Sequence, residues 1–466
     1  MKYRLFFILF LAAFPALPAP SQVRKNVSEK RVATLDTLTS FNESLTENPL
    51  ATGIAYVMRT SNETMAAVID GKIQKDYDAI GLPGVAYSPD GLRWAYIAKT
   101  GEKVRMVVDG KEHKAWDGIG TNPVFSPDGR RLAYVVRDGS AQKVVLNGKE
   151  GPAYRGIGAI GPVFSGDSKH IAYIVTDSGR SFLVLDGKAG KSYKAIVMSS
   201  LVLSHDGKRV AYAALEADTL VMVIDHRPVR NIQVAESVRP QFSRDGKHLA
   251  FAGYLRDMEY IVLDGTPGPM YDRVSDRTMA FSDNSRRFAY LAQKGGEWRM
   301  VIDGTEEKPY REIGMGTFSF SPDGAHHAYV AILDGKRIAI RDAVGGKAYD
   351  AIPTGNPVFS PDSRHLCYAA QRDGMWYLVA DGRESQACTS VLAGSIAFAP
   401  GKGAVAACVV GIAGGVSVDV DGSRGPVYDV ILTRKGGKIV FDSASAFHYL
   451  AVRGSDVLMV SEKLTP

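Results

Sequence analysis

One short motif recurs along this chain at an almost constant interval, and that interval constrains the fold more than any other feature. The stretch FSPDG at 125–129 returns at 320–324, and looser copies lie between and around these two. Alignment on the residue that opens the motif gives ten anchors: Tyr87, Phe125, Phe164, Leu203, Phe242, Phe281, Phe320, Phe359, Phe398 and Phe441. The spacing is 38 residues once, then 39 each time, and 43 before the last anchor. Such regularity without linkers indicates one supersecondary unit stacked on the next.

Each unit has the pattern of four short strands joined by tight turns. In one unit, strands are predicted over 123–126, 131–137, 143–146 and 153–157. The turns between them are Pro-Asp-Gly, Asp-Gly and Asn-Gly. Proline presets φ, Asp bonds its own backbone, and Gly accepts positive φ, so these are hairpin turns. Four antiparallel strands in about 40 residues, repeated, predict an all-β fold, the β-propeller.

The consensus F-S-P-D-G-x-x-[LI]-A-[YF] resembles the WD-like propeller repeat of TolB-type periplasmic proteins. Similar repeats form the propeller domains of prolyl-oligopeptidase-like enzymes. The resemblance covers the chain from about residue 40 onward and implies a propeller, but it implies no single activity, because the family includes binding scaffolds and accessory domains of enzymes. It also implies a separate N-terminal domain, whereas here about twenty residues separate the leader from the first repeat.

The blade count follows from the first and last units. A further unit at 54–80 precedes the first anchor, and the last unit, 438–461, has three strand-like pieces. A strand near 32–38 would supply the fourth and close the ring. The result is ten or eleven blades of about 39 residues. Because single propellers usually have four to eight, we expect two tandem rings with a seam near 236–240; one large ring is the alternative, which the unbroken spacing supports.

The N-terminus has a different composition from the repeats. Lys2 and Arg4 precede an apolar run over 5–14 and a small-residue, proline-rich stretch. This order is typical of a secretory signal peptide and is too short to span a bilayer. We therefore expect a signal peptide at 1–21, an N-terminal segment at 22–39 that can supply the closing strand, and repeats over 40–466. The expected location is the periplasm or the cell exterior, with no transmembrane segment after cleavage.

The sequence contains no recognisable catalytic, metal or cofactor motif. No G-x-S-x-G serine elbow is present, and no repeat-free stretch could house a hydrolase domain. Four histidines share one repeat position with arginines, which argues against metal ligation. Only Cys367, Cys388 and Cys408 are present, and we expect three buried thiols, with one bridge between Cys367 and Cys408 as the alternative. The net charge of +6 is spread along the chain, so nucleic acid is not expected as a partner.

Loop variation indicates which face of the propeller would bind a partner. Turns between strands one and two and between three and four repeat, whereas turns between two and three vary, and varied loops on a rigid frame commonly carry binding. The candidate contacts are Arg137, Tyr254, Arg256, Trp298, Arg372 and Trp376. The expected function is that of an exported, non-catalytic, monomeric scaffold that binds an envelope or extracellular protein. The alternatives are a propeller-type lyase or glycan hydrolase, and a module that binds a glycan or small ligand.

Overall fold

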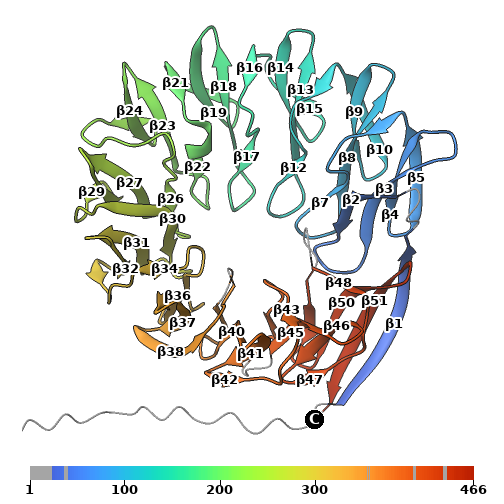
Figure 1. Ribbon diagram of the computed structural model, residues 1–466. Coiled ribbons are helices and arrows are strands. Elements are labelled where there is room, and N and C mark those ends of the chain that lie inside the picture. Colours follow the sequence, from blue (N-terminus) through green and yellow to red (C-terminus); the bar gives the residue numbers. More distant parts are fainter. Residues whose placement is uncertain are drawn as a thin grey trace, which may run out of the picture.

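The computed structural model describes residues 24–35, 40–353, 355, 357–401, 406–433 and 438–465, which form eleven antiparallel sheets in one ring (Figure 1). Each sheet is a blade. Its strands lie side by side, from an innermost strand at the centre of the ring to an outer strand at the rim. Blade 1 begins with β2, and the blades are numbered along the chain to blade 11, which ends with β51. The predicted all-β propeller of four-stranded blades is confirmed. In the described part of the chain the one helical element is the 3-10 turn η1 (Met198–Ser200).

The second and third strands of each blade form its longest hairpin. The second strands are β3 (Ile54–Arg59), β8 (Trp94–Thr100), β13 (Leu132–Asp138), β18 (Ile171–Asp177), β23 (Val210–Glu216), β27 (Leu249–Leu255), β31 (Phe288–Lys294), β36 (His327–Leu333), β40 (Leu366–Arg372), β45 (Ala406–Ile412) and β50 (Ala446–Arg453). The third strands are β4 (Met65–Ile69), β9 (Lys103–Val108), β14 (Ala141–Leu146), β19 (Arg180–Leu185), β24 (Thr219–Ile224), β28 (Met258–Leu263), β32 (Glu297–Ile302), β37 (Lys336–Arg341), β41 (Met375–Ala380), β46 (Gly415–Val420) and β51 (Asp456–Thr465).

The innermost strand is divided in most blades. Undivided inner strands are β2 (Ser40–Glu47) and β30 (Arg273–Phe281). In blades 6 and 9, β26 (Gln241–Phe242) and β39 (Val358–Phe359) are preceded by isolated bridges from Gln233 and Ala351 to the same second strands. The divided ones are β6 (Ala79–Ile80) with β7 (Ala86–Tyr87), β11 (Gly118–Ile119) with β12 (Val124–Phe125), β16 (Gly156–Ile157) with β17 (Val163–Phe164), β21 (Ala195–Ile196) with β22 (Val202–Leu203), β34 (Glu312–Ile313) with β35 (Ser319–Phe320), β43 (Ser390–Val391) with β44 (Ala397–Phe398), and β48 (Val430–Leu432) with β49 (Val440–Ser443). The two pieces pair with opposite ends of the same second strand, so the residues between them bulge away from the ladder.

The outer strands vary in length, and lysine or proline marks many of them. They are β5 (Lys72–Tyr77), β10 (Lys111–Trp116), β15 (Lys149–Glu150), β20 (Lys188–Tyr193), β25 (Arg227–Val229), β29 (Thr266–Pro267), β33 (Thr305–Glu306), β38 (Val344–Tyr349), β42 (Arg383–Glu384), β47 (Ser423–Arg424) and β1 (Arg24–Thr34). Short edges and edge lysines or prolines discourage pairing with another chain. The rim of the ring is therefore protected against aggregation.

The recurrent FSPDG stretch forms a turn in which the aspartate side chain is hydrogen-bonded within the turn itself. Ser126 Oγ donates to Asp128 Oδ1 at 2.5 Å, and the amide of Arg131 donates to Ser126 Oγ at 2.9 Å. The serine's hydrogen bond holds the pKa of Asp128 below its usual range. The same serine–aspartate contact recurs at Ser88, Ser165, Ser204, Ser243, Ser321 and Ser360. This repeated aspartate is thus a turn residue, in agreement with the interpretation from the sequence.

The Asp-Gly turn between the third and fourth strands has both central residues at positive φ, 49° at Asp109 and 80° at Gly110. This is the hairpin conformation that the sequence predicted. Asp109 Oδ1 accepts the amide of Trp94, and its Oδ2 accepts Arg93 Nε at 2.8 Å. Where the basic residue is histidine, the same contact persists, as at His170, whose Nδ1 lies 2.6 Å from Asp186. The shared repeat position of arginine and histidine is explained by this aspartate.

Neighbouring blades are joined by buried apolar clusters. A small residue of the second strand, such as Ala211 or Ala250, is fully buried and lets the adjacent blade approach. A tyrosine near the outer end of one blade packs edge-to-face on a second-strand tyrosine of the next, as in Tyr193–Tyr212 with ring centroids 6.1 Å apart. Equivalent tyrosine pairs are Tyr77–Tyr96, Tyr154–Tyr173, Tyr271–Tyr290, Tyr310–Tyr329, Tyr349–Tyr368 and Tyr428–Tyr449.

The prediction of two tandem rings, with a seam near 236–240, is wrong. Val234 and Val238 lie in a continuous cluster that joins blades 5 and 6, and Met279 and Phe288 continue the packing into blade 7. The same kind of cluster joins blade 11 back to blade 1, through Ile54, Tyr56, Leu432 and Leu450. The physical reason is the constant repeat length, which gives every interface the same geometry. Typical blade counts were a poorer guide than this spacing.

The N-terminal strand β1 completes blade 11. It pairs antiparallel with β51 over a register from Arg24↔Thr465 to Thr34↔Asp456, and Figure 1 shows it along the outside of that blade. Glu29 of β1 accepts the hydroxyl of Tyr428 at 2.7 Å and both terminal nitrogens of Arg453 at 2.7 and 2.8 Å. In blade 7, which is formed by one continuous segment of the chain, Glu306 likewise accepts hydrogen bonds from the hydroxyl of Tyr271 and from Arg299. The first strand therefore reproduces the contacts of an ordinary outer strand.

Replacement of Glu29 should weaken closure. In Glu29→Gln we expect the free energy of unfolding at pH 7 to fall by about 1 kcal/mol, because the charge-assisted hydrogen bonds with Arg453 are lost. These hydrogen bonds lower the pKa of Glu29. A carboxylate with a lowered folded-state pKa stabilises the fold above its unfolded pKa and loses that contribution as pH falls. Urea titrations should therefore show the difference between wild type and variant shrinking on acidification. The exposed Glu297, changed to Gln, is the control, and a pH-independent difference would contradict the argument.

The turn aspartates offer a second test with a matched natural control. Asp303 Oδ1 accepts the amide of Phe288 and Oδ2 accepts Arg287 Nε, both at 2.8 Å. Asp303→Ala should lower the free energy of unfolding by about 1–2 kcal/mol through loss of these bonds. Asp303→Asn should cost less, because Asn147 accepts the equivalent amide from Leu132 in blade 3. Equal destabilisation of the two variants in urea would show that the amide acceptor does not matter.

Candidate functional site

The hairpins between second and third strands point to one side of the ring, here called the hairpin face. Adjacent turns of an antiparallel blade lie at opposite ends, so this face also carries the connections between blades. An aspartate in several connections accepts an amide from the tip of the next hairpin, as Asp117 does from Gly139 at 2.6 Å. The others are Asp78, Asp272, Asp350 and Asp429. Sequence reasoning missed these caps, although an acid directly follows an aromatic residue at the same repeat position in several units, as Asp117 follows Trp116 and Asp350 follows Tyr349.

The two arginines proposed as contacts on β13 and β40 are engaged within the blades. Arg137 Nη2 donates to the carbonyl of Asp117 at 3.0 Å, which ties a hairpin to the preceding connection. Arg372 forms a bidentate pair with Glu384 at 2.7 and 2.9 Å. That pairing raises the pKa of Arg372. Both guanidinium groups therefore help to position the hairpin face.

Tyr254 and Arg256 lie at the exposed end of the blade 6 hairpin. Tyr254 is 38 % exposed and Leu255, beside it, is 48 % exposed. Arg256 is in the turn itself, at a φ of 56°. Exposed apolar side chains recur at the hairpins of blades 8 and 9, in Leu333 at 43 % and Met375 at 38 %. Exposed apolar side chains therefore stand on the hairpins of blades 6, 8 and 9.

Trp298 and Trp376 are half-buried between blades. Trp298 pairs through its backbone with Tyr310 and packs with Ile313 and Phe318 of blade 8. Trp376 pairs with Cys388 and packs with Val391 of blade 10. The six proposed contacts therefore lie in blades 3, 6, 7 and 9 and do not form one cluster.

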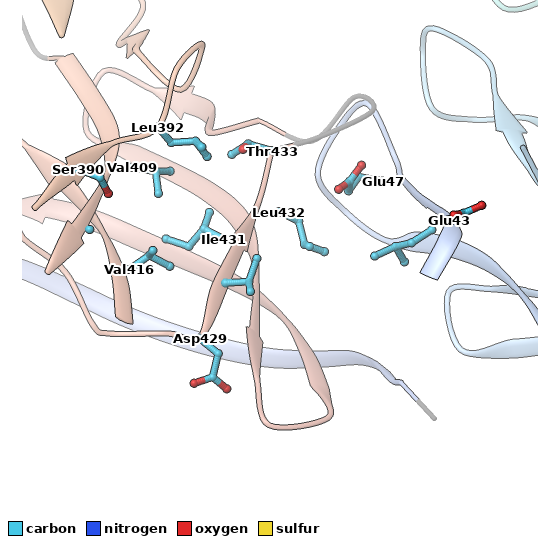
Figure 2. A pocket seen from close by; sticks show the side chains of 13 residues that line it. Glu43, Glu47, Ser390, Leu392, Val409, Val416, Asp429, Ile431, Leu432 and Thr433 are labelled. Atoms are coloured by element: carbon cyan, nitrogen blue, oxygen red, sulfur yellow. The ribbon is translucent and has the colours of Figure 1, made fainter. Parts of the chain in front are cut away.

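A cavity of about 720 Å³ lies where blades 10, 11 and 1 meet (Figure 2). Blade 10 contributes Ser390, Leu392, Val409, Gly411 and Val416, blade 11 contributes residues 429–433, and β2 contributes Glu43, Leu45 and Glu47. Figure 2 shows Glu47 and, farther out, Glu43 on the opposite side of the space from Leu392, Val409 and Ile431. Glu47 is only 3 % exposed. The cavity is thus mainly aliphatic, with carboxylates on one side.

The cross-strand pair at the cavity is smaller than its counterparts in blades 7 and 9. In blades 7 and 9 a glutamine opposes a tryptophan, in the pairs Gln293↔Trp298 and Gln371↔Trp376. In blade 10 the corresponding pair is Gly411↔Val416. Gly411 and Val416 both line the cavity, and the space directly beside Gly411 is occupied by Ser390 and Thr389.

The other side chains that could take part in a reaction or bind a metal ion are buried or already hydrogen-bonded. Cys367, Cys388 and Cys408 are buried and form no disulfide, so the alternative of a bridge between Cys367 and Cys408 is not found. Burial raises the pKa of the Cys367 thiol. Within the described ranges, no group of three or more His, Cys, Asp or Glu side chains is arranged to hold a metal ion. Nor does this part of the chain contain a helix with the length and apolar character needed to cross a bilayer. The proposed signal peptide lies outside the described residues.

No protein-family model and no curated protein matches this chain. Among solved structures it is similar to TolB from Acinetobacter baumannii, with 16% identity, a TM-score of 0.26, and coverage of 53% of this chain and 75% of that one. It is similar to the Dos1 propeller at 11% identity and a TM-score of 0.32, covering 67% of this chain and 94% of that one. It is also similar to Porphyromonas gingivalis dipeptidyl peptidase 4, with 14% identity and a TM-score of 0.36, covering 78% of this chain and 64% of that one. The propeller architecture itself rests on the eleven sheets of this structure.

Proposed function

We propose that this protein is an exported, non-catalytic scaffold that binds another protein of the envelope or cell exterior through its hairpin face. One observation carries the proposal: exposed apolar side chains stand on the hairpins of blades 6, 8 and 9, and the tip of the blade 9 hairpin is fixed by the amide of Asp373, which donates to Asp350. Tyr254, Leu255, Leu333 and Met375 supply that surface in blades 6, 8 and 9. A rigid frame with variable apolar tips loses little conformational entropy on binding.

On the face opposite the hairpin face, the side chains of the turns stabilise the fold, which supports a structural role for that face and not a role in binding. Its turns are occupied by serine–aspartate, arginine–aspartate and histidine–aspartate contacts that repeat from blade to blade. Arg131 extends this network by donating to the carbonyls of Ser168 and Lys169 in the next blade. Groups that are already paired in this way have little left to offer a partner. Export is part of the proposal and rests on the N-terminal leader-like composition.

Substitutions on the hairpin face should separate binding from folding. We expect the double variant Tyr254→Ser with Leu255→Ser to lose partners captured from envelope extracts, because the apolar contact of blade 6 is removed. Folding should be unaffected, since both side chains are exposed. The matched control is Val344→Ser, an apolar side chain that is 70 % exposed on an outer strand. The measurement is quantitative mass spectrometry of captured proteins together with the thermal midpoint. Identical capture by the double variant and wild type would contradict the proposed face.

A further inference from the structure

The turn between the third and fourth strands of blade 3 differs from its counterparts in one polar group. Its first central residue is Asn147, whereas the equivalent position in the other described turns of this kind is aspartate: Asp70, Asp109, Asp186, Asp225, Asp264, Asp303, Asp342, Asp381 and Asp421. The φ angle of Asn147 is 49°, between the 46° of Asp381 and the 52° of Asp264. The backbone of the turn is therefore the same with either side chain, and the difference lies in the chemistry of the side chain.

In several blades this aspartate accepts a hydrogen bond from an arginine that comes just before the second strand. In blade 7, Arg287 Nε donates to Asp303 Oδ2 at 2.8 Å, and the same contact measures 2.8 Å in blade 2 and 3.1 Å in blade 5. Arg131 holds this position in blade 3. Asn147 Oδ1, however, accepts the amide of Leu132 at 2.8 Å, so its Nδ2 stands where the aspartates have the oxygen that faces the arginine, and Nδ2 is itself a donor. Among the described residues, Arg131 Nε and Asn147 Nδ2 have no hydrogen-bond acceptor.

The guanidinium group of Arg131 is nevertheless held in place. Its Nη1 donates to the carbonyl oxygens of Ser168 and Lys169 at 2.9 and 2.6 Å, and the group lies over the ring of Phe164, 5.1 Å from the ring centroid. Arg287 is held in the same way in blade 7. The group thus keeps the position in which the other arginines bind a carboxylate, and it loses little conformational entropy when an acceptor arrives.

The surroundings of Arg131 favour an anion. The preceding residue, Arg130, is exposed. The acid of the SPDG turn in the same blade, Asp128, already accepts the hydroxyl of Ser126 and the amide of Arg130. A metal cation would be repelled by the two guanidinium groups, and a neutral sugar would leave the charge of Arg131 without a counter-charge. Carboxylate is the acceptor that the equivalent arginines bind, and its two coplanar oxygens match two donors.

From these observations we propose that Arg131 and Asn147 form a binding site for a carboxylate group, which plays in blade 3 the part that aspartate plays in the other blades. One carboxylate oxygen accepts the Nε–H of Arg131, and the other accepts an Nδ2–H of Asn147. The corresponding side chains in blade 7, Arg287 and Asp303, are 25 % and 44 % exposed, so a ligand can reach this position from the solvent. The site lies on the face opposite the hairpin face and is independent of the binding proposed for the hairpins.

The first test measures binding directly at the arginine. Acetate would be titrated into the full chain at neutral pH, replacing chloride at constant ionic strength, and the arginine Nε–H signals followed by nuclear magnetic resonance. The Arg131 signal is identified by its absence in Arg131→Lys. We expect it to shift saturably, with a dissociation constant on the order of 10 mM. The exposed Arg286, at the repeat position of Arg130, is the control and should not show saturation. A response at Arg131 no different from that of Arg286 would mean an adventitious ion only and would overturn the proposal.

The second test restores the side chain that the other blades carry. In Asn147→Asp the chain's own carboxylate should occupy the site, so the Arg131 signal should no longer respond to acetate. This variant should fold as wild type does, because the equivalent turns have aspartate at the same φ. An unchanged acetate-dependent shift of Arg131 in folded Asn147→Asp would refute the assigned site.

The third test makes the converse change in blade 7. Asp303→Asn reproduces the arrangement of blade 3, so the Arg287 signal should gain a saturable response to acetate that it lacks in wild type. If Asp303→Asn does not fold, Asp225→Asn makes the same change beside Arg209 in blade 5. An arginine that gains no response in a folded variant would show that an arginine and an asparagine in this geometry do not bind a carboxylate.

A last comparison identifies the source of the carboxylate. An end-blocked Gly-Asp-Gly tripeptide carries the group as a protein side chain does, whereas acetate carries it as a free small molecule. Affinity for the tripeptide about tenfold or more above that for acetate would assign the site to an acidic side chain of a partner protein, and similar affinities would assign it to a free carboxylate. The end-blocked Gly-Asn-Gly tripeptide should not bind, and a saturable shift of Arg131 with that probe would contradict recognition of a carboxylate.

Discussion

The packing of each blade against its two neighbours is the constraint on which the rest of this structure depends. A single four-stranded blade has two apolar faces and cannot bury either alone. The buried second-strand alanines and the tyrosine pairs make one interface geometry that can be repeated at every step. Such an arrangement is stable only when it leaves no terminal face exposed. The ring meets this condition because the cluster between blades 11 and 1 has the same character as the others.

Repetition also divides the polar groups into two classes. Acidic and basic residues that recur at fixed positions, such as Asp128, Asp186 and Arg131, form hydrogen bonds within turns or between blades. Side chains that break the pattern are the ones free to differ from blade to blade. Gly411 and Val416 illustrate this, since they stand where blades 7 and 9 have a glutamine and a tryptophan, and both line the cavity. In a repeat protein, a departure from the consensus therefore changes the shape of one blade interface and leaves the others unaltered.

Much of the fold could be predicted from the sequence because spacing and turn chemistry are local signals. The hairpin turn at Asp109-Gly110 and the small residue Ala211 were visible as repeat positions. Ring number was not visible, because it depends on how small rotations between blades accumulate over the whole chain. The cavity could not be predicted either, since it requires contacts among β2, β45 and β48, which are far apart in sequence. The half-buried state of Trp298 and Trp376 was missed for the same reason.

The pairing of β1 with β51 joins residues separated by more than 420 positions. During synthesis, the strand that begins the ring must wait for the last strand to emerge before it has a partner. Ten blades can pack in order as they appear, but the eleventh lacks its outer strand until the N-terminus returns to it. Closing so long a loop is entropically costly and slow, so the final sealing step is a late event in folding. Until then, the edge of β51 lacks its partner strand and is open to pairing with another chain.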